Sequence, residues 1–195
     1  IGKYLYKFFH ESDLYGLNNF VMNNDQIILD IGANDGVSSK FFKSIFPMST
    51  VYAYEPINLH FFELQKLINK NIILRQFGVS SKKNKIYLYY PSVSFFNKKY
   101  YLSAYTQTSK KVLQKDIREQ FVFKNNLTIE KNLIEIKPIE EEFNKKIFLI
   151  KIDVNGNEYD VINSLEKYII NSLPVIVCEV SENVFKINNY LDTFG

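Results

Sequence analysis

The sequence ILDIGANDGVSSKFF, residues 28–42, joins a short apolar run to a glycine-rich turn and a helix-like segment. The apolar run, residues 27–31, is of the kind that is buried in parallel sheets. Residues 38–46 have the pattern of a helix, and Pro47 closes it. A buried strand, a glycine turn and a helix in this order predict the first unit of an α/β sheet, where ligands bind at the carboxyl ends of the strands.

Strand and helix patterns alternate further along the chain. We expect strands at 50–55, 71–77, 146–153 and 174–180, and helices at 58–69, capped by Asn58, and at 158–168. This alternation predicts right-handed parallel crossovers and a sheet covered by helices on both faces. It also predicts a helical segment over residues 1–26, with helix-like spacing from 4 to 22, followed by one α/β domain over 27–195.

An insertion at about residues 81–146 interrupts this alternation. Residues 85–90 and 132–139 alternate as strands do, but the stretch between them, 91–131, is polar, aromatic and lysine-rich without a clear period. Such a segment is typical of a lid or a mobile loop. Its lysines and tyrosines would also suit a nucleic-acid surface, but acids elsewhere nearly cancel the charge, so we expect a solvated insertion.

The composition is that of an ordinary globular domain. The chain has 195 residues, 46% hydrophobic residues and a net charge of +3, which is too small to imply a nucleic-acid partner. It has no apolar stretch of the ~18 residues that a membrane span needs, and no signal peptide at its start, so we expect a cytoplasmic protein. The single cysteine, Cys178, lies in an apolar run and is expected in the core. The start without methionine and the abrupt end indicate a fragment.

The glycine turn has the shape of a ligand site without the marks of a pyrophosphate site. Gly32 and Gly36 let the backbone approach a ligand closely, and the following helix favours negative charge at its N-terminus. However, Asn34 stands where the dinucleotide motif G-x-G-x-x-G has its second glycine, and the phosphate loop G-x-x-x-x-G-K-[ST] is missing.

Two acids frame this turn. Glu55 ends the next strand about 20 residues beyond the glycines, where an acid accepts hydrogen bonds from a ribose diol. Asp30 would pair with an ammonium group, while N–H groups of the turn take a carboxylate. An adenosine that carries a small zwitterion is S-adenosylmethionine. The alternative is that Asp30 and Glu55 only cap turns.

Four blocks of the sequence resemble the FkbM-type S-adenosylmethionine-dependent methyltransferases. In order, they are LDIGANDGVSS, VYAYEP, LIKIDVNGNEYDVI and PVIVCEV, and together they span about residues 27–180. The resemblance implies a Rossmann-like class I methyltransferase fold and, mostly, O-methylation of sugars or polyketide-type metabolites. It also implies that Asp153 lies near the reaction centre and that the cofactor is bound by Asp30, Gly32, Asn34, Gly36 and Glu55.

This chain departs from the family pattern at two points. The pattern usually has Glu where this chain has Asn155, which weakens a metal or base role there. The chain also ends before the last strands that close the sheet of the family, so the C-terminal end of the fold is expected to be incomplete.

Three acids are candidates for the chemistry. Asp153, Glu158 and Glu179 lie at or just after the ends of two neighbouring strands. They could position the acceptor, take its proton or hold a divalent cation. The alternatives are that Asp153 or Asn155 caps the helix and that Glu158 answers the helix dipole. We expect Asp153 to orient or deprotonate a hydroxyl directly, with no obligatory metal.

The histidine of the helix predicted at 58–69 adds no candidate for the chemistry. His60 lies in this helix, among aromatic residues, and is expected to pack rather than to act as a base. The sequence therefore predicts a methyltransferase that acts on a hydroxyl of a carbohydrate or small metabolite, with no nucleic-acid partner. The alternatives are a non-catalytic S-adenosylmethionine-binding remnant and an NAD-dependent oxidoreductase, which Asn34 disfavours.

Overall fold

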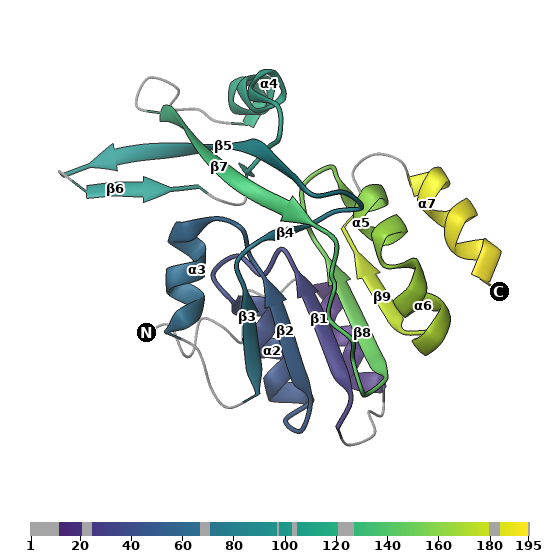
Figure 1. Ribbon diagram of the computed structural model, residues 1–195. Coiled ribbons are helices and arrows are strands. Elements are labelled where there is room, and N and C mark those ends of the chain that lie inside the picture. Colours follow the sequence, from purple (N-terminus) through teal and green to yellow (C-terminus); the bar gives the residue numbers. More distant parts are fainter. Residues whose placement is uncertain are drawn as a thin grey trace.

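The computed structural model describes residues 12–20, 25–66, 71–96, 98–102, 105–120, 127–179 and 184–194. Its central sheet has the strand order β3-β2-β1-β8-β9, and every neighbouring pair in it is parallel (Figure 1). The strands are β1 (Ile27–Ile31), β2 (Thr50–Tyr54), β3 (Ile72–Arg75), β8 (Ile147–Ile152) and β9 (Val175–Cys178). This order reverses next to β1, so β1 lies at the topological switch point where open α/β sheets bind ligands.

Side chains of β1 alternate between the two faces of the sheet, and each face has its own helices. Ile28 packs with Leu14 of the 3₁₀ helix η1 (Ser12–Asn19) and with Phe42 of α2 (Val37–Ile45). Leu64 of α3 (Asn58–Gln65) joins the same cluster. One layer of helices therefore covers the face to which Ile28 points.

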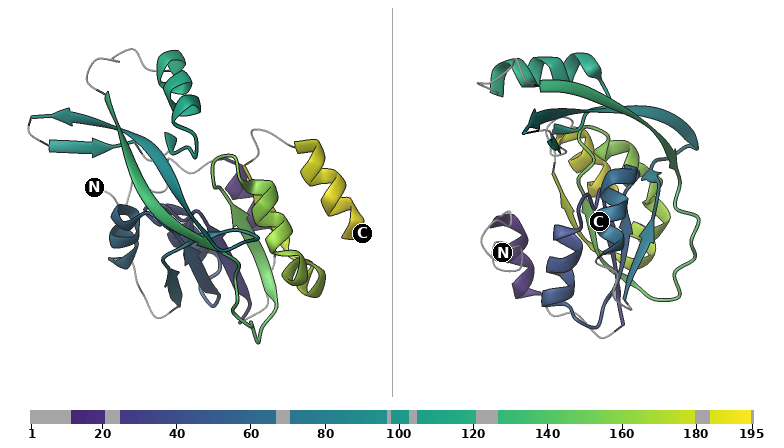
Figure 2. Two further views of the ribbon diagram at one scale, coloured as in Figure 1. Left: turned by 45° about the horizontal axis from the view of Figure 1, so that its top comes forward. Right: turned by 90° about the vertical axis from the view of Figure 1, so that its left-hand side faces the viewer.

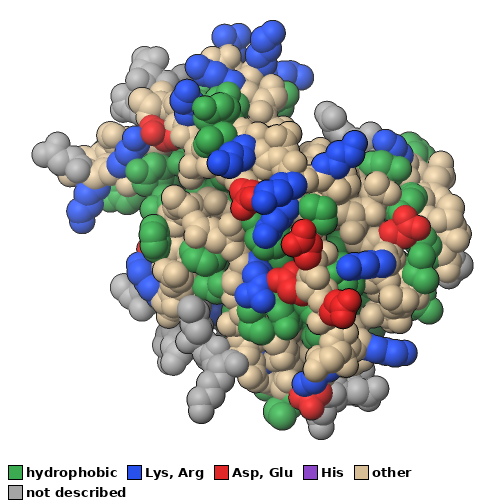
Figure 3. Space-filling view, in the orientation of Figure 1, with side chains coloured by type: hydrophobic (Ala, Val, Ile, Leu, Met, Phe, Trp, Pro, Cys, Tyr) green, Lys and Arg blue, Asp and Glu red, His purple; other side chains and the backbone are tan. Residues whose placement is uncertain are grey.

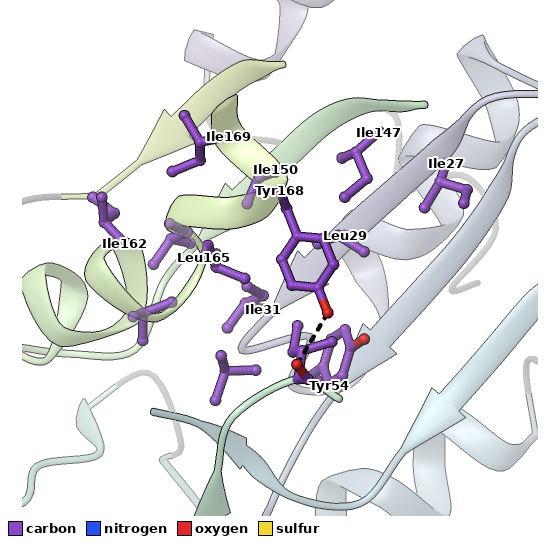
Figure 4. Close-up of a cluster of buried hydrophobic side chains, with 14 of the residues drawn as sticks. Ile27, Leu29, Ile31, Tyr54, Ile147, Ile150, Ile162, Leu165, Tyr168 and Ile169 are labelled. Atoms are coloured by element: carbon purple, nitrogen blue, oxygen red, sulfur yellow. Dashed lines mark hydrogen bonds between the residues drawn. The ribbon is translucent and has the colours of Figure 1, made fainter. Parts of the chain in front are cut away.

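The other face of the sheet buries Ile27, Leu29 and Ile31 against the C-terminal helices. These are α5 (Glu158–Ser164), α6 (Glu166–Ser172) and α7 (Val184–Leu191), which is followed by the 3₁₀ helix η4 (Asp192–Phe194). Figure 4 shows this cluster, with the Tyr168 hydroxyl donating a hydrogen bond to the carbonyl of Ile139 at 3.0 Å. The chain thus has the predicted three-layer α/β architecture.

The insertion contains a second sheet, which is more regular than the sequence predicted. Its order is β4-β7-β5-β6, with β4 (Gly78–Val79), β5 (Asn84–Phe95), β6 (Lys98–Tyr101) and β7 (Leu127–Lys137). Helix α4 (Lys110–Gln120) also lies in the insertion and buries Leu113 and Ile117. The expectation of an irregular stretch at 91–131 is therefore wrong for the end of β5, for β6, for α4 and for the start of β7; residues 97, 103–104 and 121–126 lie outside the described part.

The second sheet lies across the carboxyl ends of the first, as Figures 1 and 2 show. Its β5 and β7 strands pair antiparallel from Asn84↔Ile136 to Val93↔Leu127. Charged side chains of both signs mix on the face drawn in Figure 3, and Lys99 pairs with Glu130 at 2.7 Å. No helix in the described ranges is long and apolar enough to cross a bilayer.

Some expected helix boundaries differ from those observed. Helix α3 begins after Ile57, and Asn58 does not cap it, because its side-chain oxygen accepts a hydrogen bond from Gln76 instead. The helix expected at 158–168 is divided at Leu165 into α5 and α6. Of the helical segment expected at 4–22, the structure describes residues 12–20, where η1 forms; the rest lies outside the described residues.

Candidate active site

A cavity of about 340 Å³ lies between the two sheets, at the carboxyl ends of the first. This volume falls within the range of small-molecule sites. The strand ends and the loops after them provide its floor, which is lined by Gly32, Asn34, Tyr54, Glu55, Pro56, Ile57, His60, Asp153, Val154, Asn155, Asn157 and Glu179. The second sheet and the loop before α4 line the rest with Gly78, Val79, Ile86, Leu88, Thr106, Gln107, Thr108, Ile134 and Ile136.

The glycine turn adopts the backbone conformation for which its residues are suited. Gly32, Asn34 and Gly36 have φ values of 77°, 50° and 83°, the left-handed region that glycine and asparagine tolerate best. At Gly32 there is also no room for a side chain, because a Cβ atom would lie 1.9 Å from the carbonyl oxygen of Asp153. The turn after β1 and the loop after β8 are therefore in direct backbone contact. Gly36 is the N-cap residue of α2 and is not among the cavity-lining residues.

Glu55 is buried at the end of β2, with its carboxylate next to the glycine turn. Oε2 accepts a hydrogen bond from the Asn34 N–H at 2.9 Å, and Oε1 accepts one from the Ile57 N–H at 2.7 Å. Burial raises the pKa of Glu55 to about 7, although the two backbone hydrogen bonds and the charge of Lys151 act in the opposite direction. Each oxygen retains a lone pair for a further donor.

Asp30 has a different position from the one expected. It shares a face of β1 with Ile28, is fully buried, and is not among the residues that line the cavity. Its Oδ2 accepts hydrogen bonds from Ser38 at 2.7 Å and from Ser39 at 2.5 Å, both in the first turn of α2. Its Oδ1 lies 3.6 Å from Nζ of Lys151. The carboxylate thus ties β1, α2 and β8 together, and it does not face the cavity, where a ligand's ammonium group would lie.

Of the three acids proposed for chemistry, two line the cavity and one does not. Asp153 and Glu179 line the cavity, and their N–H groups continue the strand pairing by donating to Ile31 and Ile152, both at 3.1 Å. Glu158 is buried and outside the lining, and its Oε1 accepts a hydrogen bond from the Gly156 N–H at 2.7 Å. Within the described ranges, no group of three or more His, Cys, Asp or Glu side chains is arranged to hold a metal ion.

Comparison with known proteins identifies this arrangement. The family model of the methyltransferase FkbM domain matches residues 30–194. The chain belongs to the FkbM methyltransferase family. Its match includes the glycine turn, Glu55, the second sheet and the loop after β8, so the cavity lies wholly within the FkbM domain.

Individual relatives are distant from this FkbM domain. A crystal structure of methyltransferase FkbM from Methylobacillus flagellatus superposes with a TM-score of 0.58 at 15% identity, over 92% of this chain and 41% of that one. A crystal structure of a precorrin-6y C5,15-methyltransferase from Geobacter metallireducens superposes with a TM-score of 0.47 at 14% identity, over 93% of this chain and 69% of that one.

Among curated proteins, the AMB antimetabolite synthetase AmbE of Pseudomonas aeruginosa is 22% identical over 92% of this chain and 10% of its own length. The chain therefore spans about a tenth of that relative and less than half of the solved FkbM protein.

Asn155, where the resemblance led us to expect Glu, has a backbone φ of 53°. Asparagine is among the few residues besides glycine that adopt this conformation readily. Gly156 follows with a φ of 101°, so the loop after β8 makes a tight left-handed bend. The residue type at 155 therefore suits the bend, and its side chain adds no carboxylate to the cavity.

Several lining residues of the FkbM domain were missed by sequence reasoning. His60, expected only to pack, is buried in α3 and lines the cavity, and its burial lowers its pKa. Residues of the second sheet were missed because their pairing was not recognised. Lys151, which is buried beside the site and outside the cavity lining, was also missed; a lysine in a strand that is otherwise apolar, directly opposite Asp30, was the available signal. Cys178 is half-buried, and burial raises its pKa to about 12, as suits an unreactive thiol.

Proposed function

We propose that this FkbM domain binds S-adenosylmethionine in the cavity between the sheets and methylates a hydroxyl group of a sugar or small metabolite. One observation carries the proposal: a single cavity has Glu55 and the glycine turn along one part of its floor, and Asp153 and Glu179 along another. A group that recognises a ribose and an acid that handles a hydroxyl therefore face the same space.

The residues present fit this cofactor on structural grounds. The side-chain oxygen of Asn34 is buried and has no hydrogen-bond partner among the described residues, so a donor on the ligand would satisfy it. The carboxylate of Glu55 has lone pairs for the two ribose hydroxyls. When bound, the cofactor supplies an electrophilic methyl group on a sulfonium sulfur.

The role of Asp153 follows from its position. It is the acid after β8, its side chain is 30% exposed, and Oδ2 lies 3.2 Å from Nζ of Lys151. That contact fixes one oxygen and leaves the other to accept a hydrogen bond from the hydroxyl of the acceptor. We infer that Asp153 orients this hydroxyl and receives its proton. The methyl group of the cofactor is already electrophilic, so alignment and removal of the hydroxyl proton are the steps that the protein has to assist.

The cavity also suits an acceptor that is only partly polar. Ile86, Leu88, Ile134 and Ile136 present an apolar surface from the second sheet, and Thr106, Gln107 and Thr108 add polar groups beside it. Apolar walls with a few placed polar groups are typical of small-molecule sites. A sugar or a small metabolite with a hydroxyl fits both kinds of wall.

A methyl-transfer assay with Asp153→Asn tests this role. With an accepted hydroxyl substrate, we expect kcat to fall by ~10²–10⁴-fold while the affinity for S-adenosylhomocysteine and the folding stay nearly unchanged. Asp192→Asn makes the same chemical change on an exposed residue of η4 and should leave kcat unchanged. Full activity of Asp153→Asn would remove Asp153 from the mechanism, and loss of wild-type activity on EDTA treatment would show that a metal is required.

A non-catalytic S-adenosylmethionine-binding domain is the second candidate function. Asn155 favours it, because this chain lacks the carboxylate that the family usually has there. The same assay separates the two candidates. Binding of S-adenosylhomocysteine without methyl transfer to any of a panel of sugars and hydroxylated metabolites favours the non-catalytic function.

A further inference from the structure

Lys151 is a buried cation next to the loops that form the cavity floor, and it is not itself among the lining residues. It lies in β8, in the run IFLIKI, and only 7% of it is exposed. Lysine is almost never buried at this level unless it is paired. Its strand position is directly opposite Asp30 of β1, so the register of the sheet brings the two charges together.

The ammonium group of Lys151 contacts both of the loops that meet at the cavity. Nζ donates a hydrogen bond to the carbonyl of Gly32 at 2.8 Å, and it lies 3.2 Å from Oδ2 of Asp153. Asp30 stands behind it at 3.6 Å and is itself held by the two serines of α2. The glycine turn and the acid after β8 are therefore bound to one cation, which the buried Asp30 keeps in place.

The charge of Lys151 reaches a third carboxylate. It favours the charged form of Glu55, where the nearby Asp30 opposes it. The other acids near this part of the sheet are Glu158 and Glu179, whose charges act on Cys178 at the end of β9. Lys151 thus contacts the carboxylates of Asp30 and Asp153, and its charge also acts on Glu55.

We propose that Lys151 is a positioning residue that fixes the cofactor turn and the acceptor acid relative to each other, through Gly32 and Asp153. This role rests on the proposed function and adds to it the group that sets the distance between methyl donor and hydroxyl. Methyl transfer is an in-line displacement, and a misplacement of ~1 Å costs about 10²-fold in rate. The turn at Gly32 already lies against the carbonyl of Asp153. A cation that binds both loops therefore fixes their relative position.

A purely structural lysine would make a different prediction. If Lys151 only balanced Asp30, removing both charges would leave the site unaffected, because a buried pair can often be replaced by uncharged groups of similar size without loss of stability. If Lys151 positions Asp153, the same double change would lower kcat, and Lys151→Met alone would also raise the pKa of Glu55. The double variant Asp30→Asn/Lys151→Met therefore tests the role without leaving a buried charge unpaired.

The experiment compares this double variant and Lys151→Met with the wild type and with Lys43→Met. Lys43 is a matched control, a half-buried lysine of α2 that donates to the carbonyls of Pro47 and Ser49, in the segment between α2 and β2. The first readout is an NMR titration of the Glu55 carboxyl carbon in the unliganded protein. The second is kcat and KM for methyl transfer, and thermal unfolding checks that each variant folds.

In Lys151→Met, we expect the titration midpoint of Glu55 to move upward, because the cation that favours its charged form is removed while Asp30 remains. In the double variant, the two lost charges act on this midpoint in opposite directions, so the deciding result there is kcat, which we expect to fall by about 10²-fold with a smaller change in KM. Lys43→Met should change neither. An unchanged Glu55 midpoint in Lys151→Met, or an unchanged kcat in the double variant, overturns the positioning role, whatever happens to thermal stability. If the wild type binds no S-adenosylhomocysteine, the proposed function fails, and the titration of the unliganded protein still decides whether Lys151 acts on Glu55.

Discussion

Glu55 shows how a single buried residue can make ligand binding depend on pH. Its pKa is raised to about 7 because the carboxyl group is buried beside the glycine turn. Ribose hydroxyls donate hydrogen bonds best to the charged form, so the affinity for S-adenosylhomocysteine should increase as the pH rises from 6 to 8. Titration calorimetry at several pH values checks this, and Glu55→Gln should flatten the profile. A wild-type affinity that is constant over this range would contradict the placement of the ribose.

The stability of the unliganded protein should respond to Glu55 in the opposite direction. Because the pKa in the folded state lies above the ordinary value of 4.5, the folded protein holds this proton more tightly than the unfolded chain. The stabilisation is fully present below about pH 4.5 and is lost as the pH rises through about 7, by about 3 kcal/mol. In urea unfolding, the wild type should therefore lose more stability than Glu55→Gln between pH 5 and pH 8. Equal losses would show that Glu55 is not perturbed.

Gly32 lies where the neighbouring backbone leaves no room for a side chain. A methyl group there would meet the carbonyl oxygen of Asp153 at 1.9 Å and would also be strained at a φ of 77°. Gly32→Ala should lower the free energy of unfolding by ~2 kcal/mol or more and weaken cofactor binding, because the loop after β8 has to move. Gly16→Ala is the control, since nothing lies within 4 Å of its Cβ position. Equal stability of the two variants would argue against close contact of the loops.

At the residue scale, the sequence indicated which residues surround the turn but not where each side chain points. Glu55 and Asp153 were predicted at strand ends, and both line the cavity. Asp30 was misplaced, although the period of a strand gives the reason: it lies two residues after Ile28 and shares its face, which α2 covers. Glu158 folds back onto the Gly156 N–H, a contact that depends on the bend at Asn155 and leaves no sign in a spacing pattern.

At the scale of elements, the parallel sheet was predicted well and the insertion poorly. The strands of the first sheet are short apolar runs, which local pattern identifies. The second sheet depends on β5 pairing with β7, from Asn84↔Ile136 to Val93↔Leu127, so the paired residues lie far apart in the sequence. Most side chains of β7 are only half-buried, so its apolar pattern is weak. Tertiary pairing rather than local propensity defines these strands.

The two sheets should differ in dynamics. All four residues of β6 are exposed, whereas all five residues of β1 are buried between two layers of helices. Amides of β6 should therefore exchange with solvent quickly and those of β1 and β8 slowly, with β5 and β7 between them, because opening free energies follow local burial. Hydrogen exchange followed by mass spectrometry measures this order. Exchange in β6 as slow as in β1 would contradict the expectation that part of the insertion is mobile.

At the scale of the molecule, the two sheets together form the site. The first sheet alone presents Glu55 and Asp153 at an open edge, and the second sheet, with β4, β5 and β7, closes a cavity over them. This chain covers 41% of the solved FkbM protein, so the acceptor and partners of the whole protein remain proposals. The expectation that no nucleic acid is bound likewise stays a prediction, although Lys99, Lys83 and Lys115 pair with acids within the insertion.

Titration calorimetry with S-adenosylhomocysteine and with NAD tests the central claim most directly. We expect S-adenosylhomocysteine to bind and NAD not to bind, since the turn lacks the second glycine of the dinucleotide motif. Glu55→Ala should weaken binding by ~10–100-fold, the equivalent of about 1.5–3 kcal/mol for hydrogen bonds to a charged group. Glu63→Ala, which removes an exposed acid of α3, should bind as the wild type does. Binding of NAD in preference to S-adenosylhomocysteine, or full affinity in Glu55→Ala, would contradict the account.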